Sequence, residues 1–141
     1  MLARGHGQIV GISSLAADLP NPRAAPYGAS KAGLTFFLES IDIELRPRGV
    51  AVTIVHPGFV RTPMLAELTE INERTPLALT AEQAARIIDR GIQRRTRLVR
   101  FPWTLGFVSR LTGALPRALT DPLVRSITAE RRRPGSDLLS P

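Results

Sequence analysis

The chain of 141 residues is predicted to fold as an α/β domain built on a partial, doubly wound parallel sheet. A short apolar, β-branched run at 8–13 predicts a buried strand. A second run, at 50–55, is apolar throughout and does not alternate, which indicates a parallel sheet covered on both faces. A helical pattern lies between them. Strand, crossover helix and strand form one unit, for which the usual right-handed connection is expected.

The predicted helix between the two strands starts at Tyr27, after a proline-rich loop at 20–26. Its side chains recur at steps of four and three residues, which is the spacing of one buried helix face. This stripe consists of Tyr27, Lys31, Leu34, Leu38, Ile41 and Leu45. Asp42 and Glu44 are assigned to the solvated side of the helix, and residues 46–49, with a proline and a glycine, are expected to end it.

The second strand is followed by a loop at 56–63, at its carboxyl end. In open α/β sheets this edge is where ligands bind. A short helix is expected at 65–74. A further helix should run from Thr80 to about Arg95, opened by a capping box in which Thr80 is followed three residues later by Gln83.

The C-terminal segment begins with a candidate third strand at 98–101. Trp103, Phe107 and Leu111 then continue a four-residue stripe, which predicts an amphipathic helix. This face is expected to pack against protein, with contact to a membrane surface as the less favoured alternative. The predicted units are a half-domain at 1–101, a basic helical extension at 102–133 and a disordered tail at 134–141.

The net charge of +7 arises entirely in the C-terminal half. Residues 1–75 hold seven basic and seven acidic side chains, whereas residues 76–141 hold twelve arginines and five acids. Most of these arginines are scattered along predicted helices, so solvated helix faces explain them and no nucleic-acid partner is expected. A basic surface at 76–141 that binds nucleic acid or anionic lipid is a third-ranked alternative for the function.

The absence of cysteine excludes disulfides, thiolate metal sites and cysteine catalysis, and it fits a reducing cytoplasm. The two histidines, His6 and His56, have no partner at a metal-ligand spacing, so no metal site is predicted. No apolar run approaches the roughly 18 residues that indicate a membrane span. These observations predict a cytoplasmic protein without a metal centre.

Tyr27 and Lys31 are the only tyrosine and the only lysine of the chain, and they are four residues apart on the predicted helix. Positions i and i+4 lie on one helix face, with Cβ atoms roughly 5–6 Å apart, so an ammonium group is expected beside the phenol. A close positive charge favours the phenolate form. A phenol tuned in this way can donate and accept a proton near neutral pH, which makes Tyr27 a candidate general acid/base.

Three motifs, in this order along the chain, resemble the short-chain dehydrogenase/reductase family. They are Ile9-Val10-Gly11-Ile12-Ser13-Ser14, then Tyr27-x-x-x-Lys31, then Pro57-Gly58-x-Val60-x-Thr62. The separation of Ser14 and Tyr27 also matches that family. The match covers about residues 1–100. It implies a Rossmann-type domain, of which this chain looks like the C-terminal half.

The resemblance implies a role for each motif residue. Tyr27 is expected to exchange a proton with the substrate oxygen, Lys31 to tune Tyr27 and hold the nicotinamide ribose, and Ser14 to hydrogen-bond the substrate carbonyl. The implied cofactor is NAD or NADP, because no side chain can supply a hydride. The residues expected to contact it are Ile12, Tyr27, Lys31, Pro57, Gly58, Val60 and Thr62.

The implied substrate is a small carbonyl or alcohol compound, for which the apolar C-terminal segment suggests a lipophilic character. The sequence lacks the family's phosphate-binding turn, because Gly5 and Gly7 precede the predicted strand, whereas such a turn follows a strand and opens a helix. Without a preceding half, the first strand would form an unpaired sheet edge. We therefore expect a homo-oligomer or an aggregation-prone chain. A non-catalytic half-domain is the second-ranked alternative for the function.

Overall fold

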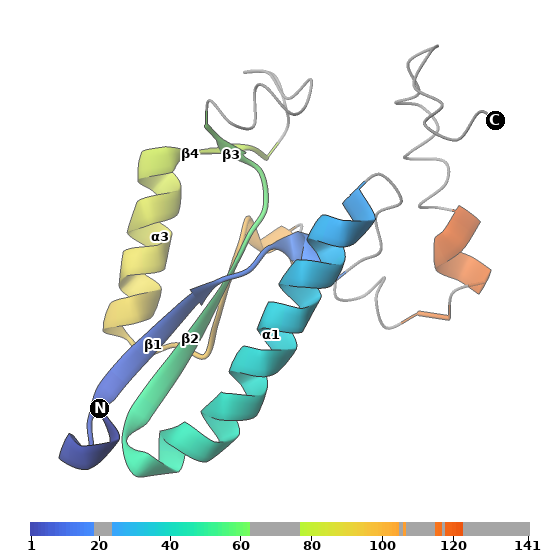
Figure 1. Cartoon of the computed structure of the whole chain (residues 1–141). Helices are drawn as coiled ribbons and strands as arrows, with labels where there is room; N and C mark the ends of the chain where they lie inside the picture. Colours follow the sequence, from blue (N-terminus) through green and yellow to red (C-terminus); the bar gives the residue numbers. More distant parts are fainter. Residues whose placement is uncertain (19–23, 63–76, 105, 107–114, 117, 123–141) are drawn as a thin grey trace.

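The fold is a three-stranded parallel sheet in the order β1-β2-β5, and Figure 1 shows α1 and α3 flanking it on opposite sides. The computed structural model describes residues 1–18, 24–62, 77–104, 106, 115–116 and 118–122. The strands are β1 (Gly7–Ile12), β2 (Val50–Pro57) and β5 (Leu98–Phe101), and the helices are α1 (Ala25–Leu45) and α3 (Ala81–Gln93). The predicted α/β class with a partial parallel sheet is confirmed.

The central strand β2 is buried along its length, from Val50 to His56. Its side chains alternate between two cores. Val52 and Ile54 pack with Leu38 on the α1 side, whereas Val55 packs on the α3 side with Ala84, Val99 and Phe101. Each fully buried aliphatic side chain contributes roughly 1.5–3 kcal/mol, so β2 needs apolar residues toward both layers. This explains why its sequence is a continuous apolar run.

Two glycines allow the helices to approach the sheet closely. A Cβ added to Gly11 of β1 would overlap with the side chain of Leu38 on α1. A Cβ added to Gly91 of α3 would overlap with Val99 of β5. The absence of a side chain at these two positions therefore sets the distance between each helix and its strand.

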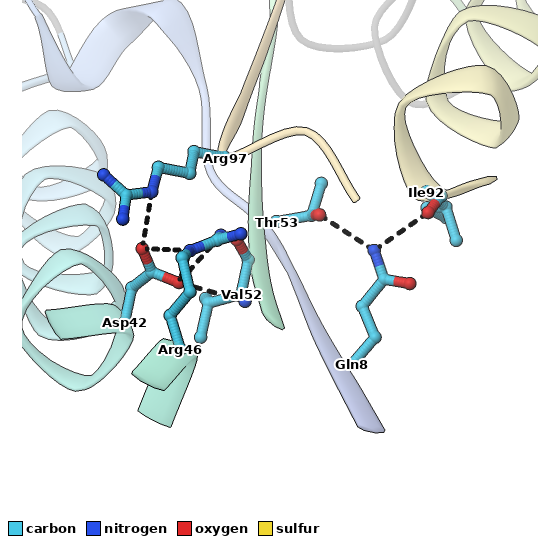
Figure 2. Close-up of polar contacts among 7 residues, drawn as sticks. All are labelled: Gln8, Asp42, Arg46, Val52, Thr53, Ile92 and Arg97. Atoms are coloured by element: carbon cyan, nitrogen blue, oxygen red, sulfur yellow. Dashed lines mark hydrogen bonds and ion pairs between the residues drawn. The ribbon is translucent and has the colours of Figure 1, made fainter. Parts of the chain in front are cut away.

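A buried carboxylate fastens α1 to β2, as Figure 2 shows. Asp42 accepts hydrogen bonds from Arg46 Nε at 2.9 and 3.0 Å and from the Val52 N–H at 3.1 Å, and Arg97 Nε lies 3.2 Å from its Oδ2. Asp42 is only 7% exposed, so its assignment to the solvated side of the helix was wrong. Glu44 is exposed, as predicted.

A second polar contact joins β1 to the end of α3 (Figure 2). Gln8 Nε2 donates to Thr53 Oγ1 of β2 at 2.9 Å and to the carbonyl of Ile92 at 3.0 Å. Gln8 therefore gives the buried Thr53 hydroxyl a donor and ties β1 to the end of α3, where the Ile92 carbonyl also accepts from the Arg95 N–H.

The helix boundaries follow local signals. The predicted capping box is confirmed, because Thr80 Oγ1 accepts from the Gln83 N–H and Gln83 accepts from the Thr80 N–H. α1 begins at Ala25, two residues before the predicted start, with Pro26 in its first turn, where a missing N–H has no cost. The described residues also include three short 3-10 helices: η1 (Leu2–Arg4), η2 (Leu15–Ala17) and η4 (Arg46–Arg48).

One small sheet was not predicted: β3 (Val60–Arg61) pairs in parallel with β4 (Leu79–Thr80). The helix predicted at 65–74 lies outside the described residues, as do Phe107, Leu111 and the tail at 134–141. The domain division at 102–133 therefore stays a prediction. No helix among the described residues has the length and apolar composition to cross a membrane.

Within the described part of the chain, β1 pairs with β2 only, so its other side is a sheet edge, as expected. Val10 and Ile12 on this strand are exposed, so the prediction of a buried strand was wrong for β1. An open, apolar edge presents unpaired backbone groups to other chains. The edge of β1 is thus a surface of the described fold where backbone groups have no strand partner and apolar side chains are exposed.

Replacing Gly11 by alanine should lower the free energy of unfolding by about 1–3 kcal/mol, because the new methyl group overlaps with Leu38. The matched control is Gly33→Ala in α1, where a Cβ meets no atom within 4 Å and should stabilise the helix by about 0.5–1 kcal/mol. Urea denaturation measures both. Equal stability of Gly11→Ala and wild type would contradict the close packing of α1 on β1.

Candidate active site

The carboxyl ends of the three parallel strands meet at one edge of the sheet. Ile12 pairs with Val55, and Pro57 pairs with Phe101, so the last residues of β1, β2 and β5 lie side by side. α1 follows the end of β1 in the chain and starts near this edge (Figure 1). Because strand ends of this kind form the ligand crevice of open α/β sheets, this edge is the candidate active site.

Tyr27 and Lys31 lie on the same side of the first turns of α1. Lys31 Nζ is 5.7 Å from the centroid of the Tyr27 ring, and it donates a hydrogen bond to the carbonyl of Ile12 at 3.0 Å. Tyr27 is 49% exposed, so the residue is open to a ligand. The ammonium group thus links the phenol to the carboxyl end of β1, as the helical spacing predicts.

Ser14 caps η2, directly after β1. Its Oγ accepts a hydrogen bond from the Ala16 N–H at 3.1 Å, which leaves its own proton available to an acceptor. The turn lies against the start of α1, because a Cβ added to Gly28 would be 3.1 Å from the carbonyl oxygen of Ala16. Ser14 is therefore carried by a turn that contacts the residue next to Tyr27.

The Pro57-Gly58 pair lies at the same edge. The Gly58 N–H donates to the carbonyl of Phe101 at 2.7 Å. A Cβ at Gly58 would lie 3.0 Å from Pro102 Cδ and 3.2 Å from Leu15 Cδ1. Packing alone thus explains the glycine, and a role in cofactor binding stays a prediction.

Three other predicted residues are placed differently. The side chain of Val60 packs into the core on the α3 side, so only its backbone is available to a ligand. Thr62 is half-buried and ends the described segment beyond β3. Ile12 is exposed, and its carbonyl is occupied by Lys31. The structure thus brings together Ile12, Tyr27 and Lys31, with the Ser14 turn and Gly58 nearby.

A partly buried polar cluster beneath this edge was not predicted. The His56 ring is fully buried, and its Nδ1 lies 3.4 Å from Asp18 Oδ1. Arg100 Nη2 donates to the same carboxylate at 3.3 Å, and Arg100 Nε is 3.3 Å from Oδ2. The one available signal was a histidine at the end of an otherwise apolar strand, which needs a buried polar partner.

The charges of this cluster act on Asp18. Burial raises the pKa of its carboxyl group, but the hydrogen bond and the charge of His56, together with the charge of Arg100, lower it by more. The net pKa of Asp18 is therefore below its ordinary value of 3.8, and the group is a carboxylate at neutral pH. Among the described residues, no three potential ligands cluster in a way that could hold a metal ion.

The arrangement fits the nicotinamide end of a dinucleotide. An accessible phenol and an ammonium group lie at the carboxyl edge of the sheet, where they can hydrogen-bond a ribose and a substrate oxygen. None of the described strands β1, β2 and β5 is followed by a glycine-rich turn that opens a helix. The described residues therefore supply no counterpart for the pyrophosphate.

The chain matches the family model of short chain dehydrogenases over residues 1–73. An uncharacterized oxidoreductase of Myxococcus xanthus is 38% identical over 128 residues, which cover 90% of this chain and 49% of the relative. A putative ketoacyl reductase of Streptomyces coelicolor is 46% identical over 70 residues, which cover 50% of this chain and 27% of that protein. The chain thus spans half or less of the length of these two relatives.

Solved structures agree with these matches. A short chain dehydrogenase from Burkholderia cenocepacia, in complex with NADP, superposes with a TM-score of 0.70 at 24% identity, over 86% of this chain and 49% of the other. Actinorhodin polyketide ketoreductase with NADPH is 29% identical, with a TM-score of 0.63, over 75% of this chain and 49% of that chain. The parallel sheet, the order of the three motifs and the family match together show that this chain belongs to the short chain dehydrogenase family.

Proposed function

We propose that the protein carrying this chain is an NAD(P)-dependent oxidoreductase that interconverts alcohols and carbonyl compounds. The observation that carries this proposal is the placement of Lys31 Nζ between the Tyr27 ring and the Ile12 carbonyl at the carboxyl edge of the sheet. The presence of NADP and NADPH in two solved relatives supports the cofactor class. The family's oxidoreductase members support the reaction class.

In the direction of reduction, the Tyr27 hydroxyl donates its proton to the substrate oxygen as negative charge develops there. The Ser14 hydroxyl donates a hydrogen bond to the same oxygen, since its lone pair already accepts from Ala16. Lys31 stabilises the phenolate that remains. NAD(P)H supplies the hydride when it is bound, and Lys31 together with the Pro57-Gly58 loop would hold its nicotinamide end.

The finer features stay proposals. A lipophilic ketone or aldehyde is the proposed substrate, and the cytoplasm is the proposed location. The competing function is a non-catalytic half-domain that keeps the motifs without binding a dinucleotide. One observation favours this alternative: the described strands carry no pyrophosphate turn.

Replacing Tyr27 by phenylalanine should lower NADPH-dependent turnover of ketones by about 10²–10⁴-fold, because it removes only the proton donor. NADPH affinity, measured by nicotinamide fluorescence, and urea stability should stay unchanged. The matched control is Ser40→Ala, which deletes one hydroxyl on the same helix, where Ser40 bonds the Phe36 carbonyl away from the site.

Undiminished turnover of Tyr27→Phe would refute the catalytic role of the phenol. A folded wild-type chain that binds neither NADH nor NADPH would refute the oxidoreductase assignment for this chain and establish the half-domain alternative.

We further propose that the chain forms a homo-oligomer that covers its exposed apolar surface. Val10 and Ile12 on β1 and Phe36, Phe37 and Ile43 on α1 are exposed. Size-exclusion chromatography with light scattering should show a dimer or a larger species. Ile43→Lys should shift the population toward the monomer, whereas Glu44→Gln, at the adjacent exposed position, should not. A stable, cooperatively unfolding monomer of the wild-type chain would contradict this proposal.

A further inference from the structure

We propose that Asp18 and His56 are positioning residues for the candidate active site, and that they form a buried ion pair which fixes the direction of a hydroxyl chain ending at Lys31. Only the catalytic consequence rests on the proposed function. The charge state of His56 does not depend on the proposed function. It is inferred from the number of protons that the contacts of its two ring nitrogens require.

The chain of contacts starts at the backbone of Lys31. Ser13 Oγ donates to the Lys31 carbonyl at 3.0 Å, Ser13 Oγ lies 2.8 Å from Thr35 Oγ1, and Thr35 Oγ1 lies 3.1 Å from His56 Nε2. Each hydroxyl has one proton, and a carbonyl can only accept. The Ser13 proton is therefore used on Lys31, so Thr35 must donate to Ser13. The contact with His56 then requires a proton on Nε2.

The other ring nitrogen faces a carboxylate. His56 Nδ1 lies 3.4 Å from Asp18 Oδ1 and 3.5 Å from Oδ2. A carboxylate only accepts hydrogen bonds, so Nδ1 must carry a proton as well. With both nitrogens protonated, His56 is an imidazolium. A neutral ring protonated at Nδ1 would instead accept from Thr35, and Thr35 would accept from Ser13, so the Lys31 carbonyl would lose the Ser13 proton that its 3.0 Å contact indicates.

The charges around the ring support this assignment. Among the described residues packed against His56, the charged groups are the Asp18 carboxylate and the Arg100 guanidinium, which itself pairs with Asp18. A fully buried imidazolium requires an anionic partner, because an unpaired buried charge is costly. Asp18 supplies it, since its carboxylate lies 3.4 Å from His56 Nδ1.

The position of the chain gives the ion pair a function. It joins η2, α1, β2 and β5, and its Lys31 end adjoins two predicted catalytic groups. Ser13 precedes Ser14, and the Lys31 carbonyl belongs to the residue whose Nζ reaches Ile12. Groups that act on one substrate atom must be held within roughly 0.5 Å of their productive geometry. The hydrogen bonds from His56 through Thr35 and Ser13 to the Lys31 carbonyl all run in one direction, so they can hold the catalytic groups in place without contacting the substrate.

The direct test is nitrogen NMR of the full chain labelled with ¹⁵N-histidine. Only two histidines are present, and the exposed His6 serves as the internal reference. At pH 7 both ring nitrogens of His56 should be protonated. Asp18→Asn should remove the Nδ1 proton, whereas Glu44→Gln, which neutralises an exposed carboxylate on α1, should leave the His56 spectrum unchanged. A wild-type His56 with one unprotonated nitrogen at pH 7 would overturn the ion pair.

The positioning role is tested by amide hydrogen exchange. Asp18→Asn should accelerate exchange of the Ala16 and Ala17 amides, which bond to Ser14, by at least tenfold, and leave the amides of α3 unchanged. Equal acceleration of amide exchange in η2 and α3, or no acceleration in η2, would overturn a local positioning role. The NMR spectrum and the hydrogen-exchange rates do not depend on turnover. An inactive chain would therefore contradict the proposed function without contradicting this inference.

If Asp18→Asn fails to fold, the wild-type spectrum still decides the charge state, and acid unfolding of the wild type decides the pairing. A carboxylate with a lowered folded pKa stabilises the fold above its unfolded pKa of about 3.9, and this contribution is lost as the pH falls through the folded pKa. Wild-type stability should therefore drop below about pH 4. Unchanged stability as the pH falls through the folded pKa of Asp18 would overturn the pairing.

Discussion

The parallel pairing of β2 with both of its neighbours is the constraint on which the rest of the structure depends. Because β1, β2 and β5 run in the same direction, their carboxyl ends lie at one edge, and the chain must leave each strand there. α1 returns across one face and α3 across the other, so β2 is enclosed on both sides. The residues of the candidate site lie at these carboxyl ends or in the segments that follow them.

Lys31 shows how closely structure and proposed chemistry overlap at this edge. Its ammonium group reaches the last residue of β1, and its carbonyl accepts from the serine that follows this strand. One helical residue therefore holds the strand end at two points. The same ammonium lies beside the Tyr27 ring, so the geometry proposed for proton transfer cannot change without disturbing the junction between β1 and α1.

Sequence patterns were sufficient to predict those features that depend on residues close together in the chain. The strands, both long helices and the Thr80 capping box follow from periodicity and end signals, and the spacing of Tyr27 and Lys31 places them together. Asp42 was misassigned because its partners Val52 and Arg97 belong to other segments, although its position four residues after buried Leu38 was a hint. Asp18 and His56 are 38 residues apart, and no pattern along the chain pairs them. Strands of two residues, such as β3, carry no period.

The register of β1 against β2 also constrains how the chain can be made. Gln8 pairs with Ala51, so the first strand has no neighbour in the described fold until the second has been synthesised. Until then, its apolar residues and those of α1 leave the ribosome without their partner surface. The segment from β1 to the end of α1 is therefore the part of the described fold that most needs chaperone protection against premature association during synthesis.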